Sequence, residues 1–385
     1  MSGGDDPLIR ATFAPRTMAT TNRSTTKRPS TPNPAPRTFD PGAAATADSG
    51  IYGLPHSEAD ARVVVLPVPF AATTSYGGGA EKGPKAIFEA SKQVDLFDID
   101  TGRPYEAGIH MRKIPQSILR LHREGRGLAK RVIDAGGEIG GNKALARALA
   151  RVNQISAEVD DWVYEQSREI VQAGKLLALV GGDHSTPFGA IRAVAERHPG
   201  LGVLHVDAHA DLRRAYEGFD GSHASIMFNV TSKVADVARL VQVGIRDFSE
   251  EEFERIEQSG GRIRAHFDSD LQRATAAGES WIAQCQRIVS ALPDRVYVSF
   301  DIDGLDPTLC PHTGTPVPGG LTFPQASQLV GEVVRSGRTI VGVDLNEVVP
   351  GEEDEWDGNV GARMLYKMIG WMLVSNGAST PPRRG

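Results

Sequence analysis

Short apolar segments alternate with helix-like segments along most of this chain, and this alternation restricts the possible folds more than any other feature. Seven segments of strand length are rich in β-branched and other apolar residues on both faces, as parallel strands covered by helices must be. They cover residues 63–69, 176–181, 202–207, 240–244, 262–267, 295–301 and 340–344. We therefore expect an α/β fold with a mainly parallel sheet and helices on both faces.

The segments between these strands have helical periodicity. The expected helices cover residues 84–96, 115–135, 144–173, 187–196, 249–257, 279–292, 323–336 and 360–374, and the second of them belongs to an insertion at 101–142. No apolar run reaches the roughly 18 residues that a transmembrane helix needs. The sequence therefore predicts no membrane partner.

The two ends of the chain differ from its middle. Residues 1–48 are rich in Ser, Thr, Pro, Arg and Ala and lack apolar periodicity, so we expect a disordered N-terminal tail. No acidic residue lies between Asp6 and Asp40, and this composition leaves an organelle transit peptide open as the alternative. Residues 376–385 are expected to form a C-terminal tail, which leaves residues 49–375 as the catalytic domain.

Charge and cysteine content exclude several classes of protein. The formal net charge is −6, which argues against a nucleic-acid partner or a charged membrane surface. The two cysteines, Cys285 and Cys310, are too few for a disulfide framework. We therefore expect a cytoplasmic protein, or an organellar one if the N-terminal tail is a transit peptide.

Three of the expected strands end in residues that commonly bind metal ions. The segments read Leu-Ala-Leu-Val-Gly-Gly-Asp-His-Ser at 177–185, Val-Leu-His-Val-Asp-Ala-His-Ala-Asp at 203–211, and Val-Tyr-Val-Ser-Phe-Asp-Ile-Asp-Gly-Leu-Asp-Pro at 296–307. In each segment the polar residues begin where the apolar run stops. Ligands bind at this carboxyl edge of parallel sheets, so we expect the three clusters to meet there.

The spacing within the clusters indicates metal ligands. Alternate residues of an extended chain point the same way, so Asp207, His209 and Asp211 can share one face and Asp301 and Asp303 another. With His184 the set has two imidazoles and four carboxylates, and the carboxylates would repel one another strongly unless cations compensate their charge. Two divalent cations fit this count.

The nature of the ligands suggests both the metal and the reaction. Nitrogen and oxygen ligands suit Mn²⁺ and also Ni²⁺, Co²⁺, Fe²⁺ or Zn²⁺. Two such ions, ~3.5–4 Å apart, can hold a bridging water and lower its pKa enough for hydroxide to attack at neutral pH. We therefore expect hydrolysis of a polarised carbon centre.

The motifs Gly-Gly-Asp-His-Ser, Asp-Ala-His-Ala-Asp and Ser-Phe-Asp-Ile-Asp-Gly-Leu-Asp-Pro resemble those of the ureohydrolase family, which includes arginase and agmatinase. The resemblance spans roughly residues 50–375. It implies a three-layer α/β/α fold with a mainly parallel sheet of about eight strands, and a homo-oligomer, trimeric or hexameric. One implied metal site consists of His184, Asp207, Asp211 and Asp301, and the other consists of Asp207, His209, Asp301 and Asp303.

The resemblance also implies further roles in the site. Asp211 would accept a hydrogen bond from the bridging hydroxide, and His223 would carry a proton to the leaving amine, which suits an imidazole. Glu347, at the end of an expected strand, would pair with the substrate guanidinium. Trp356 could form a wall of the substrate pocket by stacking on that group, or could pack in the core.

The substrate is expected to be a small cationic guanidino compound. Arg213 stands where arginase has an Asn that contacts the amino-acid end of its substrate, which puts L-arginine in doubt. The segments 216–223 and 354–363 look like the agmatinase-annotated branch that contains guanidinase. We expect guanidine first, hydrolysed to urea and ammonia, then agmatine or guanidinobutyrate, then formimidoylglutamate. Alternatives of other classes are a related single-metal deacetylase and a non-catalytic regulatory member of the family.

Overall fold

All eight strands within the described residues, 39–383 of the computed structural model, run parallel in one sheet. The sheet contains β1 Val63–Val68, β2 Ile109–Met111, β3 Leu176–Gly181, β4 Leu201–Val206, β5 Val237–Ile245, β6 Ile263–Phe267, β7 Arg295–Asp301 and β8 Thr339–Asn346. The strands lie in the order β2-β1-β3-β8-β7-β4-β5-β6. The expected sheet of about eight parallel strands is confirmed.

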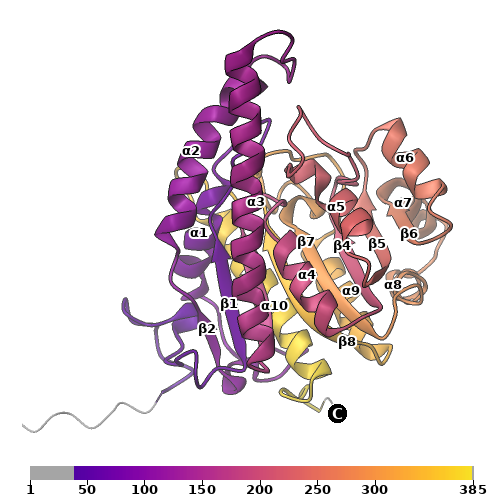
Figure 1. The fold of residues 1–385 in the computed structure, drawn as a ribbon. Coiled ribbons are helices and arrows are strands. Elements are labelled where there is room, and N and C mark those ends of the chain that lie inside the picture. The colour runs from indigo at the N-terminus through magenta and orange to yellow at the C-terminus, as the bar shows by residue number, and fades with distance from the viewer. Residues whose placement is uncertain (1–38, 384–385) are drawn as a thin grey trace, which may run out of the picture. The chain divides into compact units, whose positions relative to one another are not determined.

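Helices cover both faces of the sheet, as the alternating pattern predicts (Figure 1). Within the described residues they are α1 Gly83–Ser91, α2 Gln116–Ile133, α3 Lys143–Gln172, α4 Phe188–Arg197, α5 Ile226–Lys233, α6 Glu250–Glu257, α7 Asp268–Ala276, α8 Trp281–Val289, α9 Phe323–Arg335 and α10 Trp356–Ser375. One apolar core joins the sheet to α1, α8, α9 and α10, and a second joins it to α2 through α6. Along β1 the alternation is visible, because Val63 and Val65 enter the first core and Val64 and Leu66 the second.

Three elements were not predicted from the sequence, and one helix begins earlier than expected. β2 has only three residues, too few to show a pattern, and lies inside the 101–142 insertion. α5 and α7 are short, and α7 buries only Asp268 and Leu271, so it lacks an apolar stripe. α10 begins at Trp356 rather than at residue 360. Glycines lower helix propensity there, but Gly358 packs against Ala86 of α1. This packing stabilises the first turn of α10 despite the low propensity.

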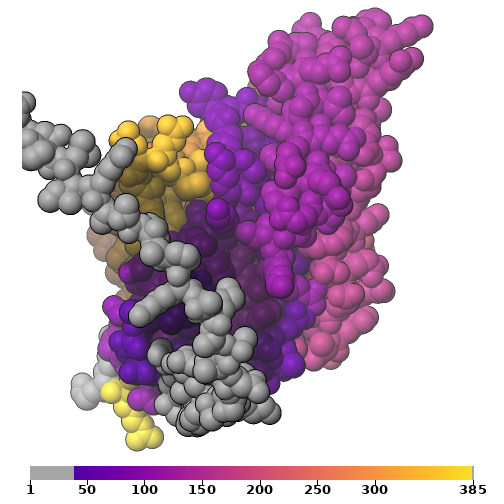
Figure 2. Space-filling view, turned by 90° about the vertical axis from the view of Figure 1, so that its left-hand side faces the viewer, coloured from indigo at the N-terminus to yellow at the C-terminus, as the bar shows by residue number. Residues whose placement is uncertain are grey.

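α2, which lies in the insertion, forms a long antiparallel hairpin with α3, which follows the insertion. α3 has 30 residues and is therefore about 45 Å long. Figure 2 shows the hairpin as a continuous flank of the molecule that rises beyond the neighbouring segments. Ala129 and Val132 of α2 and Ala148 and Val152 of α3 surround the buried Phe219, which belongs to the segment after β4. The hairpin thus holds in place the segment that follows the Asp-Ala-His-Ala-Asp motif at 207–211.

The predicted domain limits concern the ends of the chain. The expected N-terminal tail lies outside the described residues up to position 38. At the other end, the Asn376 amide donates to the carbonyl of Ile340 and the Ser379 hydroxyl to that of Thr101. No helix among the described residues is long and apolar enough to span a membrane. The limits 49–375 stay a prediction.

The contact between α3 and α4 generates a stability prediction. A Cβ on Gly189 would lie 2.6 Å from the backbone nitrogen of Tyr164 and closer still to the carbonyl oxygen of Asp160, so the two helices would have to separate. We expect Gly189→Ala to lower the free energy of unfolding by roughly 1–3 kcal/mol, measured by urea denaturation.

Gly127 of α2 provides the matched control, because it is exposed and no atom lies within 4 Å of the position that its Cβ would take. Gly127→Ala should leave the protein equally stable or stabilise it by up to about 1 kcal/mol. Equal stability of the two variants would contradict the close packing of α4 on α3.

Candidate active site

The predicted site residues leave the carboxyl ends of four strands that are neighbours in the middle of the sheet. These strands lie in the order β3, β8, β7 and β4. His184 follows β3, Glu347 follows β8, Asp301 ends β7 and Asp207 follows β4. The topology therefore gathers residues that lie up to 163 positions apart in the sequence at one edge of the sheet.

His184 lies at the centre of one group of carboxylates. Its Nδ1 atom is 3.0 Å from Asp207 Oδ2 and 3.2 Å from Asp301 Oδ2. Asp211 Oδ2 lies 3.6 Å from the same nitrogen. All four side chains are almost completely buried. The structure thus brings together the residues predicted for the first metal site.

His209 lies at the centre of a second group. Its Nδ1 atom is 3.1 Å from Asp303 Oδ2 and 3.4 Å from Asp207 Oδ1. Asp207 therefore directs one carboxylate oxygen to each histidine. Ligand atoms of Asp207, His209 and Asp303 lie within 4.8 Å of one another, and Asp207 also belongs to a group with His184 and Asp211. Two overlapping groups that share a carboxylate are the arrangement expected of a bridged pair of cations.

The electrostatics of the cluster fit cations. Burial, followed by the neighbouring Asp207, raises the pKa of Asp211 well above its usual value. Burial, followed by Asp303 and Asp207, does the same to Asp301. Burial would also raise the pKa of Asp207, but the adjacent His205 and His184 outweigh it and hold that pKa well below the usual range. Imidazoles and crowded carboxylates of this kind are a donor set for divalent cations such as Mn²⁺ or Ni²⁺.

Hydrogen bonds on the far side of the ring prepare His184 to act as a ligand. Its Nε2 atom is 2.9 Å from the hydroxyl of Ser299, and that hydroxyl is 3.0 Å from Asp344 Oδ1. Burial raises the pKa of Asp344 to about 6, so at neutral pH this carboxylate is mainly ionised and accepts a hydrogen bond from the Ser299 hydroxyl. Ser299 must then accept from Nε2–H of His184, so Nδ1, which faces the carboxylates, is the nitrogen that can bind a cation.

Glu347 lies beside this cluster in a constrained backbone conformation. Its Oε1 atom accepts a hydrogen bond of 2.9 Å from the backbone N–H of His184. Its φ angle is 63°, in the left-handed region, as is that of Asp211 at 54°. Such conformations cost on the order of 1–3 kcal/mol and persist only where the surroundings hold them. Here Glu347 N–H donates to Gly182, and its carbonyl accepts from Thr313.

His223 lies in a short 3₁₀ turn and borders the same cavity as the metal-ligand cluster. The cavity has a volume of about 140 Å³, and His209, Asp211, Arg213 and Asp247 also line it. Burial, followed by the nearby His209, lowers the pKa of His223 to about 4, so its ring is neutral at neutral pH. A neutral ring can accept a proton and pass it on.

Two further predicted residues lie outside the metal-ligand cluster itself. Trp356 is 46% exposed at the start of α10, and its indole N–H donates to the carbonyl of Thr308 rather than contacting the cluster. Its role in the pocket therefore stays a prediction. Arg213 lies at the cavity, with its Nε 3.6 Å from Glu252 Oε2 and its guanidinium over the ring of Tyr216.

His205 and Gln242 were missed by the sequence reasoning. His205 is fully buried on β4, and its Nε2 lies 2.8 Å from Asp207 Oδ2. The signal was present, because His205 stands two residues before Asp207 and so points the same way. Gln242 of β5 contacts His205 only through the pairing of the two strands, and no spacing in the sequence indicates that contact.

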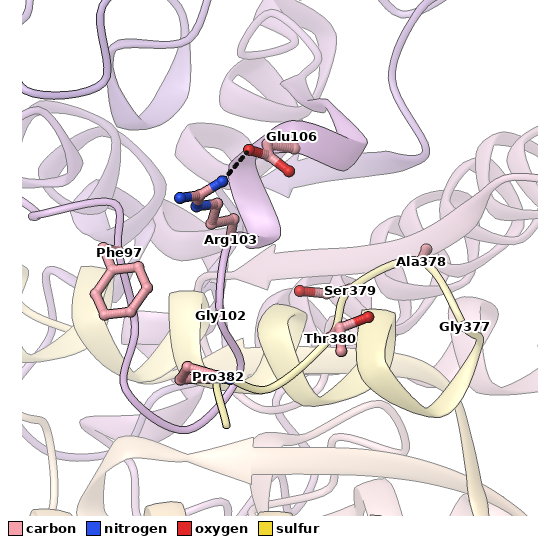
Figure 3. A pocket seen from close by; sticks show the side chains of 9 residues that line it. All are labelled: Phe97, Gly102, Arg103, Glu106, Gly377, Ala378, Ser379, Thr380 and Pro382. Carbon is pink, nitrogen blue, oxygen red and sulfur yellow. Dashed lines mark hydrogen bonds and ion pairs between the residues drawn. The ribbon is translucent and has the colours of Figure 1, made fainter. Parts of the chain in front are cut away.

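A larger cavity lies away from this site. It has a volume of about 460 Å³ and lies between the segment around Phe97–Glu106 and the chain after α10 (Figure 3). Its one ion pair joins Arg103 to Glu106 at 3.4 Å. None of the predicted site residues lines it, so the chemistry belongs to the smaller cavity.

Comparison with known proteins assigns the chain to a family. The model of the arginase family matches residues 61–370. The chain belongs to the arginase family. It is 32% identical over 313 residues to the N(1)-aminopropylagmatine ureohydrolase of Thermus thermophilus, covering 81% of this chain and 90% of that enzyme. It is 28% identical to the guanidinobutyrase of Pseudomonas aeruginosa, covering 82% of this chain and 89% of that enzyme.

Solved structures of this family share the fold. The structure of proclavaminate amidino hydrolase from Streptomyces clavuligerus matches with a TM-score of 0.64 and 24% identity, covering 86% of this chain and 98% of that one. The resemblance expected from the three motifs is confirmed, and so is the enzyme class, a hydrolase acting on linear amidines. The family assignment decides against the single-metal deacetylase alternative.

The shared position of Asp207 generates a metal-binding prediction. Asp207→Ala or Asp301→Ala would remove a carboxylate that both cations are expected to use and would leave the cations poorly neutralised. We expect either variant to lose metal and activity, with metal per chain measured by elemental analysis. Two full equivalents retained in either variant would contradict the bridging role.

Asp306→Ala is the control for these substitutions. Asp306 belongs to the same motif, but its carboxylate caps the turn by accepting from the backbone N–H and the hydroxyl of Thr308. This variant should retain as much metal as the wild type.

Proposed function

We propose that this protein hydrolyses a C–N bond of a small guanidino compound, and that guanidine is its substrate. Guanidinium and water would yield urea and ammonium. The observation that carries the proposal is the hydrogen bond from the backbone N–H of His184 to Glu347, because it fixes a carboxylate next to the metal-ligand cluster. A carboxylate is the natural partner of a planar, permanently charged guanidinium.

Two divalent cations, Mn²⁺ or Ni²⁺, would be held in the cluster. His184, Asp207, Asp211 and Asp301 would hold one, and Asp207, His209, Asp301 and Asp303 the other. When bound, such a pair supplies Lewis-acid chemistry that lowers the pKa of a water molecule toward neutrality. The remaining steps fall to side chains of the protein.

Glu347 would bind and orient the substrate. One of its oxygens already accepts from His184, which leaves the other to accept from the guanidinium. Burial, followed by the nearby Asp183, raises the pKa of Glu347 well above its usual value. A bound cation would stabilise the ionised form and lower this pKa again, so Glu347 and a charged substrate favour each other.

His223 would move the proton that the reaction requires. Its lowered pKa keeps the ring neutral in the free enzyme, so it can take a proton from the attacking water. It can then return that proton to the nitrogen that leaves as ammonia. His223 and Asp211 line the same cavity, and Asp211 can accept a hydrogen bond from the attacking group.

The size and charge of the cavity favour a small substrate. Its volume of about 140 Å³ is below the roughly 300–1,000 Å³ of most small-molecule sites. Arg213 places a positive charge at this cavity, partly balanced by Glu252 at 3.6 Å, and that charge disfavours the cationic tail of agmatine. Agmatine, guanidinobutyrate and formimidoylglutamate follow as alternatives, the second of them the substrate named for the Pseudomonas relative.

The deciding experiment is urea release from a panel of guanidino compounds after loading with Mn²⁺ or Ni²⁺. Guanidine should give the highest kcat/KM. A protein that binds both metals and releases urea from none of the compounds would instead be a non-catalytic member of the family. We further propose a cytoplasmic homo-oligomer, a trimer or hexamer.

Glu347 generates the first kinetic prediction. Glu347→Gln keeps the shape of the side chain and removes its charge, so metal binding should survive. We expect kcat/KM on guanidine to fall by about 2–4 kcal/mol, roughly 30- to 1000-fold, the scale for losing one well-placed polar contact in the transition state. Steady-state kinetics within threefold of wild type would mean that another acid holds the substrate.

Arg213 generates the second. Arg213→Met keeps an unbranched stem and removes the charge that faces the substrate tail. We expect kcat/KM on agmatine, relative to guanidine, to rise by roughly 1 kcal/mol, or about fivefold, the size of one screened charge–charge repulsion. The ratio for butylguanidine, whose alkyl tail carries no charge, serves as the control and should stay constant. An unchanged agmatine ratio would show that Arg213 does not select the substrate.

A further inference from the structure

His205 is a histidine among metal ligands whose part in the site is not assigned by the motifs. Its side chain has no exposure to solvent. Its ring centroid lies 5.1 Å from that of His184, and the two rings contact the same carboxylate oxygen of Asp207. By residue type and position it could equally be a metal ligand, since it groups with His184, Asp207 and Asp211 within 4.8 Å.

The neighbouring strand decides how His205 is protonated. Gln242 stands opposite His205 in the pairing of β4 with β5. Its Nε2 atom lies 2.7 Å from the carbonyl oxygen of Ala210. A carbonyl oxygen can only accept, so the Gln242 atom beside it must be the NH₂ group. The orientation of the Gln242 amide is thereby fixed.

The fixed amide in turn fixes the imidazole. The same Nε2 of Gln242 lies 2.9 Å from Nδ1 of His205 and donates to it, so Nδ1 carries no hydrogen. An imidazole whose Nδ1 carries no hydrogen has a single N–H. That N–H is therefore on Nε2, where it donates to Asp207 Oδ2.

His184 and His205 thus face the same oxygen in opposite ways. Ser299 accepts from Nε2–H of His184 and leaves Nδ1 as the nitrogen that can bind a cation. Gln242 donates to Nδ1 of His205 and leaves that ring's N–H toward Asp207. A ring nitrogen that carries a hydrogen cannot bind a cation. The two neighbouring strands therefore assign different parts to two identical side chains.

We propose that Gln242 locks His205 in its Nε2–H tautomer, and that His205 acts as a positioning residue that holds Asp207 for the two cations instead of binding a cation itself. The proposal rests on the dinuclear site of the proposed function and is independent of the substrate. Donors of this kind orient metal-binding carboxylates, and their removal typically weakens metal affinity roughly 10- to 100-fold. Metal affinity is therefore the quantity to measure.

The test compares two replacements of His205 in the full chain. Gln places a side-chain NH₂ near the position of Nε2 and can still donate to Asp207, whereas Leu cannot. Free Mn²⁺ is measured by electron paramagnetic resonance during titration of the metal-free protein. We expect His205→Gln to keep two sites with affinity within about threefold of wild type, and His205→Leu to lose roughly 10- to 100-fold.

Gln242 provides the second arm of the test. Gln242→Leu should weaken Mn²⁺ binding in the wild-type background and should have little further effect when His205 is already Leu, because the two residues act as one unit. The control is Gln284→Leu. Gln284 is also fully buried and donates to a hydroxyl, that of Thr275, but it lies on α8 away from the cluster. This variant should bind Mn²⁺ as the wild type does.

The outcomes separate the possible roles. If His205→Gln loses a site or loses affinity as severely as His205→Leu, His205 is a ligand and the proposal is wrong. If His205→Leu and Gln242→Leu both bind Mn²⁺ with wild-type affinity, the two residues contribute only packing, and the proposal is also wrong. Thermal unfolding of each metal-free variant shows whether it is folded, and if His205→Leu is not, His205→Gln and Gln242→Leu still decide. A wild type that binds no Mn²⁺ would overturn the dinuclear site itself, whatever the variants do.

Discussion

The mutual repulsion of four carboxylates gathered at the carboxyl edge of the sheet is the constraint on which the rest of this structure depends. Asp207, Asp211, Asp301 and Asp303 are all buried. Backbone N–H groups compensate part of the charge, because His209 donates to Asp207, Ala208 to Asp303 and Asp303 to Asp301. The imidazoles of His184 and His209 compensate more of it. Such a cluster is costly in a metal-free protein and becomes favourable with cations, which is the physical basis for proposing a metal site here.

Two residues of the proposed site, Glu347 and Asp211, are held by a constrained backbone. Glu347 and Asp211 both adopt left-handed conformations that non-glycine residues avoid. Each is held by its neighbours: Gly182 and Thr313 bind the backbone of Glu347, and the N–H groups of Met227 and Phe228 bind the carbonyl of Asp211. The α5 helix, which the sequence did not reveal, supplies those two donors. A helix that the sequence pattern did not indicate thus fixes the backbone of Asp211, a predicted metal ligand.

Hydrogen bonds beyond the cluster decide what each histidine can do. The Ser299–Asp344 pair behind His184 and the Gln242–Ala210 pair behind His205 leave opposite ends of two similar rings facing Asp207. These supporting residues come from β7, β8, β5 and the segment after β4, so each depends on which strands are neighbours. The chemistry of the centre is thereby set by the strand order as well as by the motifs.

The sequence by itself determined the parallel sheet, because strands covered on both faces must be apolar throughout, and it determined the cluster, because alternate residues at strand ends share a face. It predicted His184, Asp207 and Asp301 at one edge without any knowledge of which strands adjoin. Only the tertiary structure decided the features that depend on contacts between segments distant in the sequence. β2 and α7 are too short or too polar to show periodicity, and the indole of Trp356 is bound to Thr308 through a contact that no spacing reveals. The tautomer of His205 depends on Gln242, 37 residues away, because strand pairing places its amide against that ring.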